Sequence, residues 1–387
     1  MKNLLIYFMI FLLSGCVAKP PIDSDKNDIT PPIEHPQEPL EPIKPEDESL
    51  FHEFEKEAIL TLEKMTIEEK IGQMFLVRYP EDEKLTSYLS MKPGGFIMFG
   101  KDFANKTKEE VINNIEYCQN NNTVPMIMAV DEEGGTVVRI SSNPLLSNER
   151  FKSPQELYAL GGFEEIKRDA IAKSKLLLSL GINLNLAPVA DVSVNETDFI
   201  FQRSFGKSAE ETAHYVKTVV EAMKEQKISS SLKHFPGYGN NVDTHTGSAT
   251  DTRPYQQFLE NDFIPFKEGI LAGAESILIS HNIVEAIDTT LPASLSKNVV
   301  DILRNDMEFT GIIMTDDLSM GAISELQTES SAEVLAVSAG NDMLIVTDFE
   351  KSYNSLLNAV NSKIISEERI NESVLRILKW KYYMNLL

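Results

Sequence analysis

The sequence predicts an α/β protein built as a single (β/α)8 barrel of the TIM type. Two observations lead to this fold class. Eight short, nearly continuous apolar runs recur from about residue 51 onward, and stretches with a 3.6-residue apolar repeat separate them. Such runs are typical of parallel strands that are buried on both faces. Eight alternating β and α units in roughly 330 residues fit a closed barrel.

The expected strands and helices alternate along the chain. The strands are residues 74–77, 95–99, 126–130, 183–187, 229–233, 276–280, 311–315 and 342–346. The helices are residues 108–119, 166–180, 210–226, 258–272, 296–305, 330–339 and 366–383. An open, doubly wound sheet is the rival architecture. It ranks lower because no glycine-rich phosphate turn follows the first strand.

Another helix is expected just ahead of the first strand. Thr66 and Glu69 have the spacing of a capping box, in which each side chain accepts a hydrogen bond from the other residue's backbone N–H. We expect this helix to turn Ile71 and Met74 inward.

The first sixteen residues indicate export. Lys2 precedes an apolar run, residues 4–13, which is too short to cross a bilayer as a helix and is typical of a signal peptide. The segment Leu13-Ser14-Gly15-Cys16 resembles the lipobox of bacterial lipoproteins, which implies lipidation of Cys16 after cleavage. An ordinary secretory signal with an incidental cysteine is the alternative. Several acyl chains give stable anchoring, so we expect the protein on the outer face of the cell membrane.

Three segments follow from this pattern: a signal peptide (1–15), a tether that begins with lipidated Cys16 (16–50), and the barrel (51–387). Residues 19–50 hold nine acidic and three basic residues and eight of the 18 prolines. This composition cannot bury a core and favours a disordered, extended chain. A disordered partner-binding tail is the alternative to a simple tether.

Charge and cysteine content limit the partners. The net charge of −23 argues against nucleic acid and against anionic lipid surfaces, so the lipid anchor is the only expected membrane contact. Beyond Cys16 only Cys118 remains, and a lone thiol forms no internal disulfide. We expect a monomer that its core alone stabilises.

Ionisable residues gather where the expected strands end, which is where a (β/α)8 barrel places its active site. The opposite strand ends carry nothing comparable, so we expect the chemistry at one end only. The residues are Asp131, Glu132, Glu133 and Arg139 after the third strand; Arg203 after the fourth; Lys233, His234, Asp243 and His245 at and after the fifth; His281 after the sixth; and Asp316 and Asp317 after the seventh.

This set could support glycosyl transfer, which needs a group that attacks or stabilises the anomeric carbon and an acid for the departing oxygen. Asp316 directly follows an apolar strand, so the barrel would hold its carboxylate rigidly. The alternative for Asp316 or Asp317 is the N-cap of the next helix. Two adjacent aspartates allow both roles.

Three groups compete for the role of the acid. His245 can give and take a proton near neutrality, and Asp243 could orient its ring. Glu132 and Glu133 are the competing acids, and a solvated loop position is the alternative for His245.

The remaining polar residues could hold a sugar. Lys233 and His234 would donate to hydroxyls, Asp131 would accept from them, and Arg139 and Arg203 would reach other oxygens. A buried network without a ligand is the alternative for Lys233 and His234.

No metal or cofactor is expected. His234 and His245 lack a third ligand at a recognisable spacing, and residues 191–198 lack the pattern of a calcium loop. No phosphate-binding loop or serine nucleophile elbow occurs.

Several motifs, taken in order, resemble family 3 of the glycoside hydrolases, and in particular its β-N-acetylglucosaminidase branch. The resemblance covers nearly all of the chain from residue 65 to the last strand. The motifs are VDEEGG (130–135), RSFG (203–206), KHFPGYG (233–239) followed by Asp243-Thr244-His245, and IMTDDLSMGA (313–322).

The resemblance implies a role for each matching position. Asp316 is the nucleophile, and His245 is the acid/base, paired with Asp243. The groups that hold the terminal N-acetylglucosamine are Asp131, Arg139, Arg203, Lys233 and His234. The family's β-glucosidases take their acid from a glutamate in a second domain. We expect no such domain here, since the chain ends at Leu387 and carries the histidine loop.

Two positions depart from the family pattern. Tyr238 stands where a second histidine is usual, and Thr136 where an arginine is usual. The expected activity is that of a retaining exo-β-N-acetylglucosaminidase. It would act on cell-wall (peptidoglycan) fragments or other β-linked glycans through a covalent glycosyl-aspartate. The alternatives are a phosphorylase or β-glucosidase on the same barrel, and a sugar-binding lipoprotein without activity.

Overall fold

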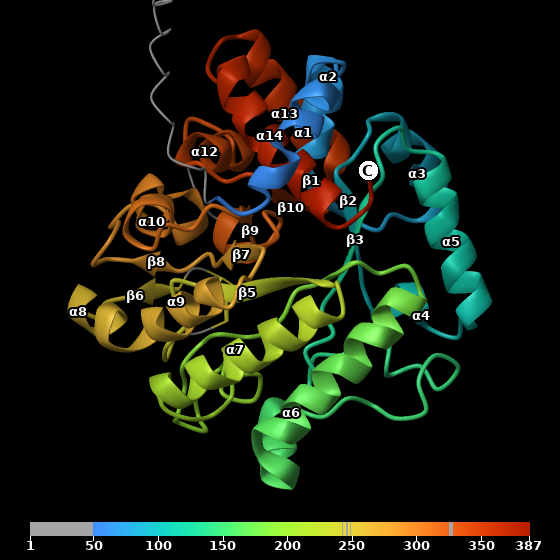
Figure 1. The fold of residues 1–387 in the computed structure, drawn as a ribbon. Coiled ribbons are helices and arrows are strands. Elements are labelled where there is room, and N and C mark those ends of the chain that lie inside the picture. Colours follow the sequence, from blue (N-terminus) through green and yellow to red (C-terminus); the bar gives the residue numbers. More distant parts are fainter. Residues whose placement is uncertain (1–48, 242, 245–246, 248, 325–327) are drawn as a thin grey trace, which may run out of the picture. The chain divides into compact units, whose positions relative to one another are not determined.

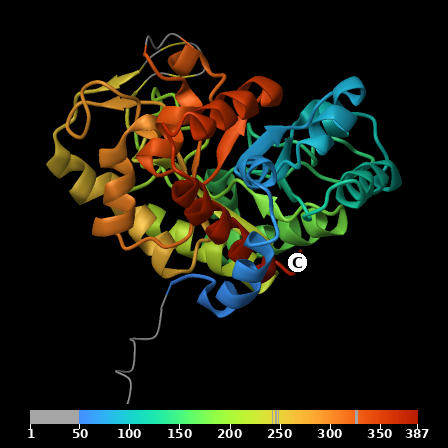
Figure 2. The same ribbon diagram turned by 90° about the horizontal axis from the view of Figure 1, so that it is seen from above.

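The computed structural model describes residues 49–241, 243–244, 247, 249–324 and 328–387. The expected signal peptide, Cys16 and nearly all of the tether lie outside these residues, as does His245. The described residues form one compact unit, in which helices surround the strands (Figures 1 and 2).

Eight parallel strands form the sheet, in the order β10-β1-β2-β3-β4-β5-β7-β9. An isolated parallel bridge between Met314, in the last strand of this order, and Met343, just before the first, brings the two outer strands together, so the sheet nearly closes into a barrel. The barrel fold and all eight expected strands are therefore confirmed. The strands are β1 (Phe75–Arg78), β2 (Gly95–Met98), β3 (Ile127–Val130), β4 (Leu184–Asn185), β5 (Ser229–Phe235), β7 (Ser276–Ile279), β9 (Ile312–Thr315) and β10 (Leu344–Val346).

A second, two-stranded sheet was not expected. It pairs β6 (Thr250–Asp251) with β8 (Ile283–Val284), and so joins the loops that follow β5 and β7. Both strands are only two residues long, which leaves no periodic signal in the sequence.

The helices follow the expected alternation. All seven expected helical regions are present, and α3 and α13 add helices after β1 and β10. The helices are α1 (Glu55–Leu62), α2 (Ile67–Gln73), α3 (Asp82–Ser90), α4 (Gly100–Phe103), α5 (Lys108–Asn120), α6 (Pro154–Ser179), α7 (Ala209–Glu225), α8 (Tyr255–Gln257), α9 (Phe263–Leu271), α10 (Lys297–Asp301), α11 (Gly321–Ser324), α12 (Ala332–Ala339), α13 (Phe349–Asn361) and α14 (Glu367–Tyr383). Short 3-10 or π turns adjoin several of them: His52–Phe54, Phe258–Asp262, Ala293–Leu295 and Ile302–Asp306.

The capping box at the start of α2 is confirmed. Glu69 N donates to Thr66 Oγ1 (3.3 Å), and Thr66 N donates to Glu69 Oε2 (3.0 Å). Ile71 and Met74 are fully buried, as expected. The cap therefore fixes where the chain enters the first strand.

The sequence shows no cluster of ionisable residues at the opposite strand ends comparable to that at the expected site, yet two buried charged side chains lie there. Asp342, just before β10, is fully buried and pairs with Arg304 (2.5 Å) and Arg376 (3.0 Å). Lys381 is fully buried and donates to Gln73 Oε1 (2.6 Å), just before β1. Asp342 was hidden in an apolar run, and its arginine partners lie on helices far away in the sequence.

No helix among the described residues is long and apolar enough to cross a membrane. Cys118, on α5, is a buried free thiol. Burial raises its pKa to about 11.

Candidate active site

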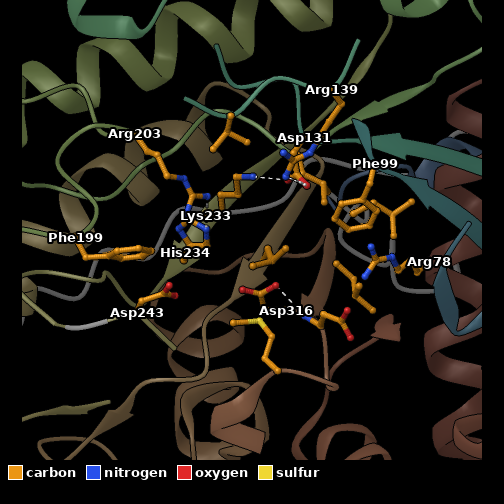
Figure 3. A pocket seen from close by; sticks show the side chains of 17 residues that line it. Arg78, Phe99, Asp131, Arg139, Phe199, Arg203, Lys233, His234, Asp243 and Asp316 are labelled. Carbon is orange, nitrogen blue, oxygen red and sulfur yellow. Dashed lines mark hydrogen bonds and ion pairs between the residues drawn. The ribbon is translucent and has the colours of Figure 1, made fainter. Parts of the chain in front are cut away.

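A pocket of about 440 Å³ lies at the C-terminal ends of the strands. It brings together eight of the residues that the sequence placed there: Asp131, Arg139, Arg203, Lys233, His234, Asp243, Asp316 and Asp317. In Figure 3 the carboxylates of Asp316 and Asp243 point into the pocket across from the pair formed by Asp131 and Lys233. All eight barrel strands or the loops after them contribute lining residues, which is typical of an active site on this fold.

Lys233 is the centre of the charged floor. Its side chain is 2 % exposed, and its Nζ lies 2.6 Å from both Asp131 Oδ1 and Glu133 Oε1. Lys233 belongs to β5, whereas both carboxylates follow β3, so this contact ties two strand ends together. Arg139 adds a longer contact to Asp131 Oδ2 (3.5 Å).

Glu133 is a buried anion held by two cations. Arg203 donates to it twice, from Nε (3.0 Å) and from a terminal nitrogen (2.7 Å). Burial alone would raise the pKa of Glu133, but the charges of Arg203 and Lys233 outweigh it and hold the pKa well below the usual range. Glu133 therefore stays ionised and cannot donate a proton near neutrality.

Glu132 serves the protein chain itself. Its fully buried carboxylate accepts hydrogen bonds from the backbone N–H groups of Arg139 (2.7 Å), Ile140 (2.7 Å) and Ser141 (3.2 Å). It thereby fixes the loop that carries Arg139 to the pocket. Both glutamates that competed for the acid role are thus structural.

The ring of His234 has a defined tautomer. A terminal nitrogen of Arg203 lies 3.1 Å from His234 Nε2. Because a guanidinium only donates, Nε2 must accept and the proton must sit on Nδ1. His234 Nδ1 then donates to Asp191 Oδ2 (2.7 Å). Both ring nitrogens have protein partners, so His234 orients Arg203, and its contact with a sugar stays a prediction.

Asp191 is the site residue that the sequence reasoning missed as a functional group. It is 1 % exposed and also accepts from the backbone N–H of Tyr238 (2.7 Å). Its signal was available, because it lies in the loop after the expected fourth strand (183–187), at the same end of the barrel as Asp131. It had been considered only as a calcium ligand.

Asp316 and Asp317 both line the pocket, but their side chains have different partners. Asp316 lines the pocket directly after β9, and its Oδ1 accepts from the N–H of Asp317 (2.8 Å). Asp317 accepts from the N–H of Ser319 (3.0 Å) and from Thr347 Oγ1 (2.8 Å), which holds the turn after the strand. His281 supports this turn, since its Nε2 lies 2.9 Å from the Asp317 carbonyl.

Two arginines flank an aromatic ring at one side of the pocket (Figure 3). The guanidinium of Arg78 lies 4.5 Å, and that of Arg139 5.5 Å, from the centre of the Phe99 ring. Cation–π contacts at such distances hold guanidinium planes in place. Arg78, Phe99 and Phe199 line the pocket and were not expected there.

Asp243 lines the pocket, whereas its expected partner His245 lies outside the described residues. Of the two departures from the family pattern, Thr136 is exposed and Tyr238 is buried. Among the described residues, no group of three or more histidine, cysteine, aspartate or glutamate side chains could hold a metal ion.

The molecule is a (β/α)8 barrel with a charged pocket at the C-terminal ends of its strands, the place where this fold carries active sites. The chain belongs to glycosyl hydrolase family 3, because residues 66–380 match the model of the "Glycosyl hydrolase family 3 N terminal domain".

Relatives with known names share this region. The chain is 26% identical over 341 residues to a "Beta-N-acetylglucosaminidase/beta-glucosidase" of Cellulomonas fimi, which covers 84% of this chain and 59% of that protein. It is also 26% identical over 297 residues to a "Beta-hexosaminidase" of Actinobacillus pleuropneumoniae, and this match covers 74% of this chain and 84% of that protein.

A solved structure is also similar: a family 3 β-N-acetylglucosaminidase from Paenibacillus sp. str. FPU-7, with a TM-score of 0.77 and 29% identity. That match covers 83% of this chain and 63% of the other. The chain therefore spans less than two thirds of the length of two of these three proteins.

Proposed function

We propose that the protein is a retaining exo-β-N-acetylglucosaminidase. One observation carries this proposal: Asp316 and Asp243 line the pocket, whereas both competing glutamates are engaged in contacts within the protein. Glu132 accepts hydrogen bonds from backbone N–H groups, and Glu133 pairs with Arg203. The names of the similar proteins favour N-acetylglucosamine as the terminal sugar. A surface enzyme of this kind would trim cell-wall fragments that carry this sugar.

The reaction proceeds by two displacements. The carboxylate of Asp316 attacks the anomeric carbon, the bond to the leaving oxygen breaks, and His245 gives that oxygen its proton. His245, oriented by Asp243, then takes a proton from water. The resulting hydroxide attacks the same carbon and releases Asp316 and the sugar with its original configuration.

The charged floor would hold the sugar during both steps. Lys233 and Asp131 can share the donors and acceptors of neighbouring hydroxyls, as a paired ammonium and carboxylate do. Arg203 is fixed by Glu133 and His234 before a ligand binds, so little side-chain entropy is lost on binding.

A panel of aryl β-glycosides tests this function. We expect turnover of the N-acetylglucosaminide to exceed that of the glucoside, with a β-configured first product by NMR. Preference for the glucoside would favour the β-glucosidase alternative. A sugar phosphate formed only in phosphate buffer would favour the phosphorylase, and no turnover would favour a binding protein.

His245→Ala tests the assigned acid. A good leaving group needs little protonation, so the variant should lose about 10²- to 10⁴-fold on an unactivated disaccharide and much less on a dinitrophenyl glycoside. Steady-state kcat/KM on both substrates measures the difference. Equal losses on the two would remove the acid role from His245.

We also propose that the protein is a lipoprotein on the outer face of the cell membrane. The lipobox-like segment that ends at Cys16 and the proline-rich stretch behind it support this placement. Cys16→Ala should abolish incorporation of labelled palmitate and move the protein from the membrane to the soluble fraction. Unchanged fractionation would contradict the anchor.

A further inference from the structure

Tyr238 occupies a position where the family pattern has histidine, and its side chain has a specific partner. The ring is 1 % exposed and packs in a small cluster with Val189 and Ile200. Its hydroxyl shares a hydrogen bond of 2.5 Å with Thr244 Oγ1. Burial raises the pKa of the Tyr238 phenol further above its normal value, so the hydroxyl keeps its proton at any pH used for an assay.

Thr244 is the residue that follows Asp243 in the sequence. It is fully buried, and its carbonyl accepts a second hydrogen bond from the N–H of Ala322 (3.3 Å), behind the turn after β9. Asp243 itself lines the pocket. Two contacts therefore hold the backbone directly beside a pocket carboxylate.

The other end of Tyr238 is tied to the sugar-holding side of the pocket. Asp191 accepts from the backbone N–H of Tyr238 through Oδ1 (2.7 Å) and from the ring of His234 through Oδ2 (2.7 Å). His234 in turn contacts Arg203. The rings of Tyr238 and His234 also pack edge to face, with their centres 5.3 Å apart.

A continuous set of hydrogen bonds thus runs from Arg203 through His234, Asp191 and Tyr238 to Thr244. It connects the groups assigned to sugar binding with the loop assigned to proton transfer. Such buried networks restrict their members to one arrangement when every partner is satisfied.

We propose that Tyr238 is a positioning residue that holds Asp243, through the hydroxyl of Thr244, in register with the sugar-holding side of the pocket. The inference rests on the proposed function, since Asp243 would orient the group that protonates the leaving oxygen. Tyr238 would not touch the substrate. It would set the geometry of the proton transfer, and its loss would be felt where that transfer limits the rate.

The test removes the hydrogen bond from each side. Tyr238→Phe and Thr244→Val, separately and together, are assayed on N,N′-diacetylchitobiose and on the dinitrophenyl N-acetylglucosaminide. We expect kcat/KM on the disaccharide to fall roughly fivefold to tenfold, the rate equivalent of one buried hydrogen bond. On the activated glycoside the change should stay within about twofold, because its leaving group needs little acid help. The double variant should lose no more than either single variant, and Thr244→Ser should restore the rate.

The chain offers a matched control outside the pocket, on two helices that contribute no lining residue. Thr61 Oγ1 and Tyr382 Oη form a similar hydroxyl pair (2.8 Å) between α1 and α14. Tyr382→Phe and Thr61→Val should leave kcat/KM on both substrates unchanged. Thermal unfolding is followed for every variant. If Tyr238→Phe does not fold, the contrast between Thr244→Val and Thr244→Ser decides.

Each outcome separates the inference from the proposed function. A wild-type chain that hydrolyses neither substrate overturns the function and the inference with it. If the wild type is active, three results overturn the inference alone. They are an equal loss of kcat/KM on both substrates, no loss in any variant, and a double variant in which the losses of the two single variants multiply.

Discussion

The two ends of the barrel bury the same kind of ion cluster for different purposes. At the C-terminal end, Glu133 lies between Arg203 and Lys233, at 2.7 and 2.6 Å. At the N-terminal end, Asp342 lies between Arg304 and Arg376, at 2.5 and 3.0 Å. In both clusters the cations outweigh the effect of burial and hold the pKa of the carboxyl below its usual value.

The difference lies in what the cations do next. Asp342 also accepts from Ser373 Oγ (2.8 Å) and from the N–H of Ile313 (3.1 Å), so its partners join a helix to the sheet. Lys233 and Arg203, the two cations that pair with Glu133, instead line the pocket. A buried ion pair therefore does not by itself indicate a functional site. An ion pair whose cation also lines a pocket does indicate one.

The largest effect is expected at Asp316. Asp316→Asn keeps the size of the side chain but removes the proposed nucleophile, so kcat should fall on the order of 10⁴-fold while thermal stability changes little. Turnover of an aryl β-N-acetylglucosaminide, together with a melting curve, checks both parts. Full activity in this variant would remove Asp316 from the mechanism.

A matched pair of substitutions tests the comparison of the two ends. Glu133→Gln leaves Arg203 without its anion and Lys233 with Asp131 alone, and Asp342→Asn leaves Arg304 and Arg376 without theirs. Each substitution should lower the free energy of unfolding by about 3–5 kcal/mol. Only Glu133→Gln frees a pocket group, and it should reduce kcat/KM of the folded enzyme on the order of 100-fold. Urea unfolding and kinetics measure the two effects.

Both carboxyls have a lowered pKa in the folded state. The stability that each contributes is therefore present above its unfolded pKa and is lost as the pH falls through that value toward the folded one.

A loss of kcat/KM in Asp342→Asn equal to that in Glu133→Gln would refute the division of labour between the ends.

Lys381, at the N-terminal end of the barrel, should make the free energy of unfolding depend on pH. Burial lowers the pKa of Lys381 to about 7, whereas the unfolded chain keeps the proton up to about 10.5. The unfolded state therefore binds more protons between these values, and stability should rise with pH across that window. From pH 7 to 9 we expect a gain of about 2 kcal/mol in the wild type and a flatter profile in Lys381→Met. Parallel profiles would show that Lys381 is not buried as an amine.

The smallest effect is expected away from both clusters. Thr66→Ala removes the cap of α2 and should cost about 1 kcal/mol of unfolding free energy without changing kinetics. Thr107→Ala, in the capping box of α5, should cost a similar amount, since Glu110 N donates to Thr107 Oγ1 at the same 3.3 Å. Denaturant midpoints of the two variants set the scale for a purely local change.

Patterns within single segments were enough to predict the barrel. Continuous apolar runs located the eight strands, and the ends of those strands located the pocket. The short strands β6 and β8 could not be predicted, because two residues show no periodicity. The roles of Glu132 and Glu133 could not be predicted either, because these adjacent glutamates differ only in the groups that their carboxylates contact. Glu132 meets backbone amides, Glu133 meets two cations, and both partner sets are fixed by tertiary contacts.

Cys118 has a practical consequence for experiments on this barrel. A thiol with a pKa near 11 is about one part in a thousand thiolate at pH 8, and burial also shields it from alkylating reagents. A cysteine introduced at an exposed position such as Leu271, which is 79 % exposed, would be the preferred site for a maleimide dye on the barrel. Within the barrel, single-site fluorescent labelling of such a cysteine therefore does not require replacement of Cys118.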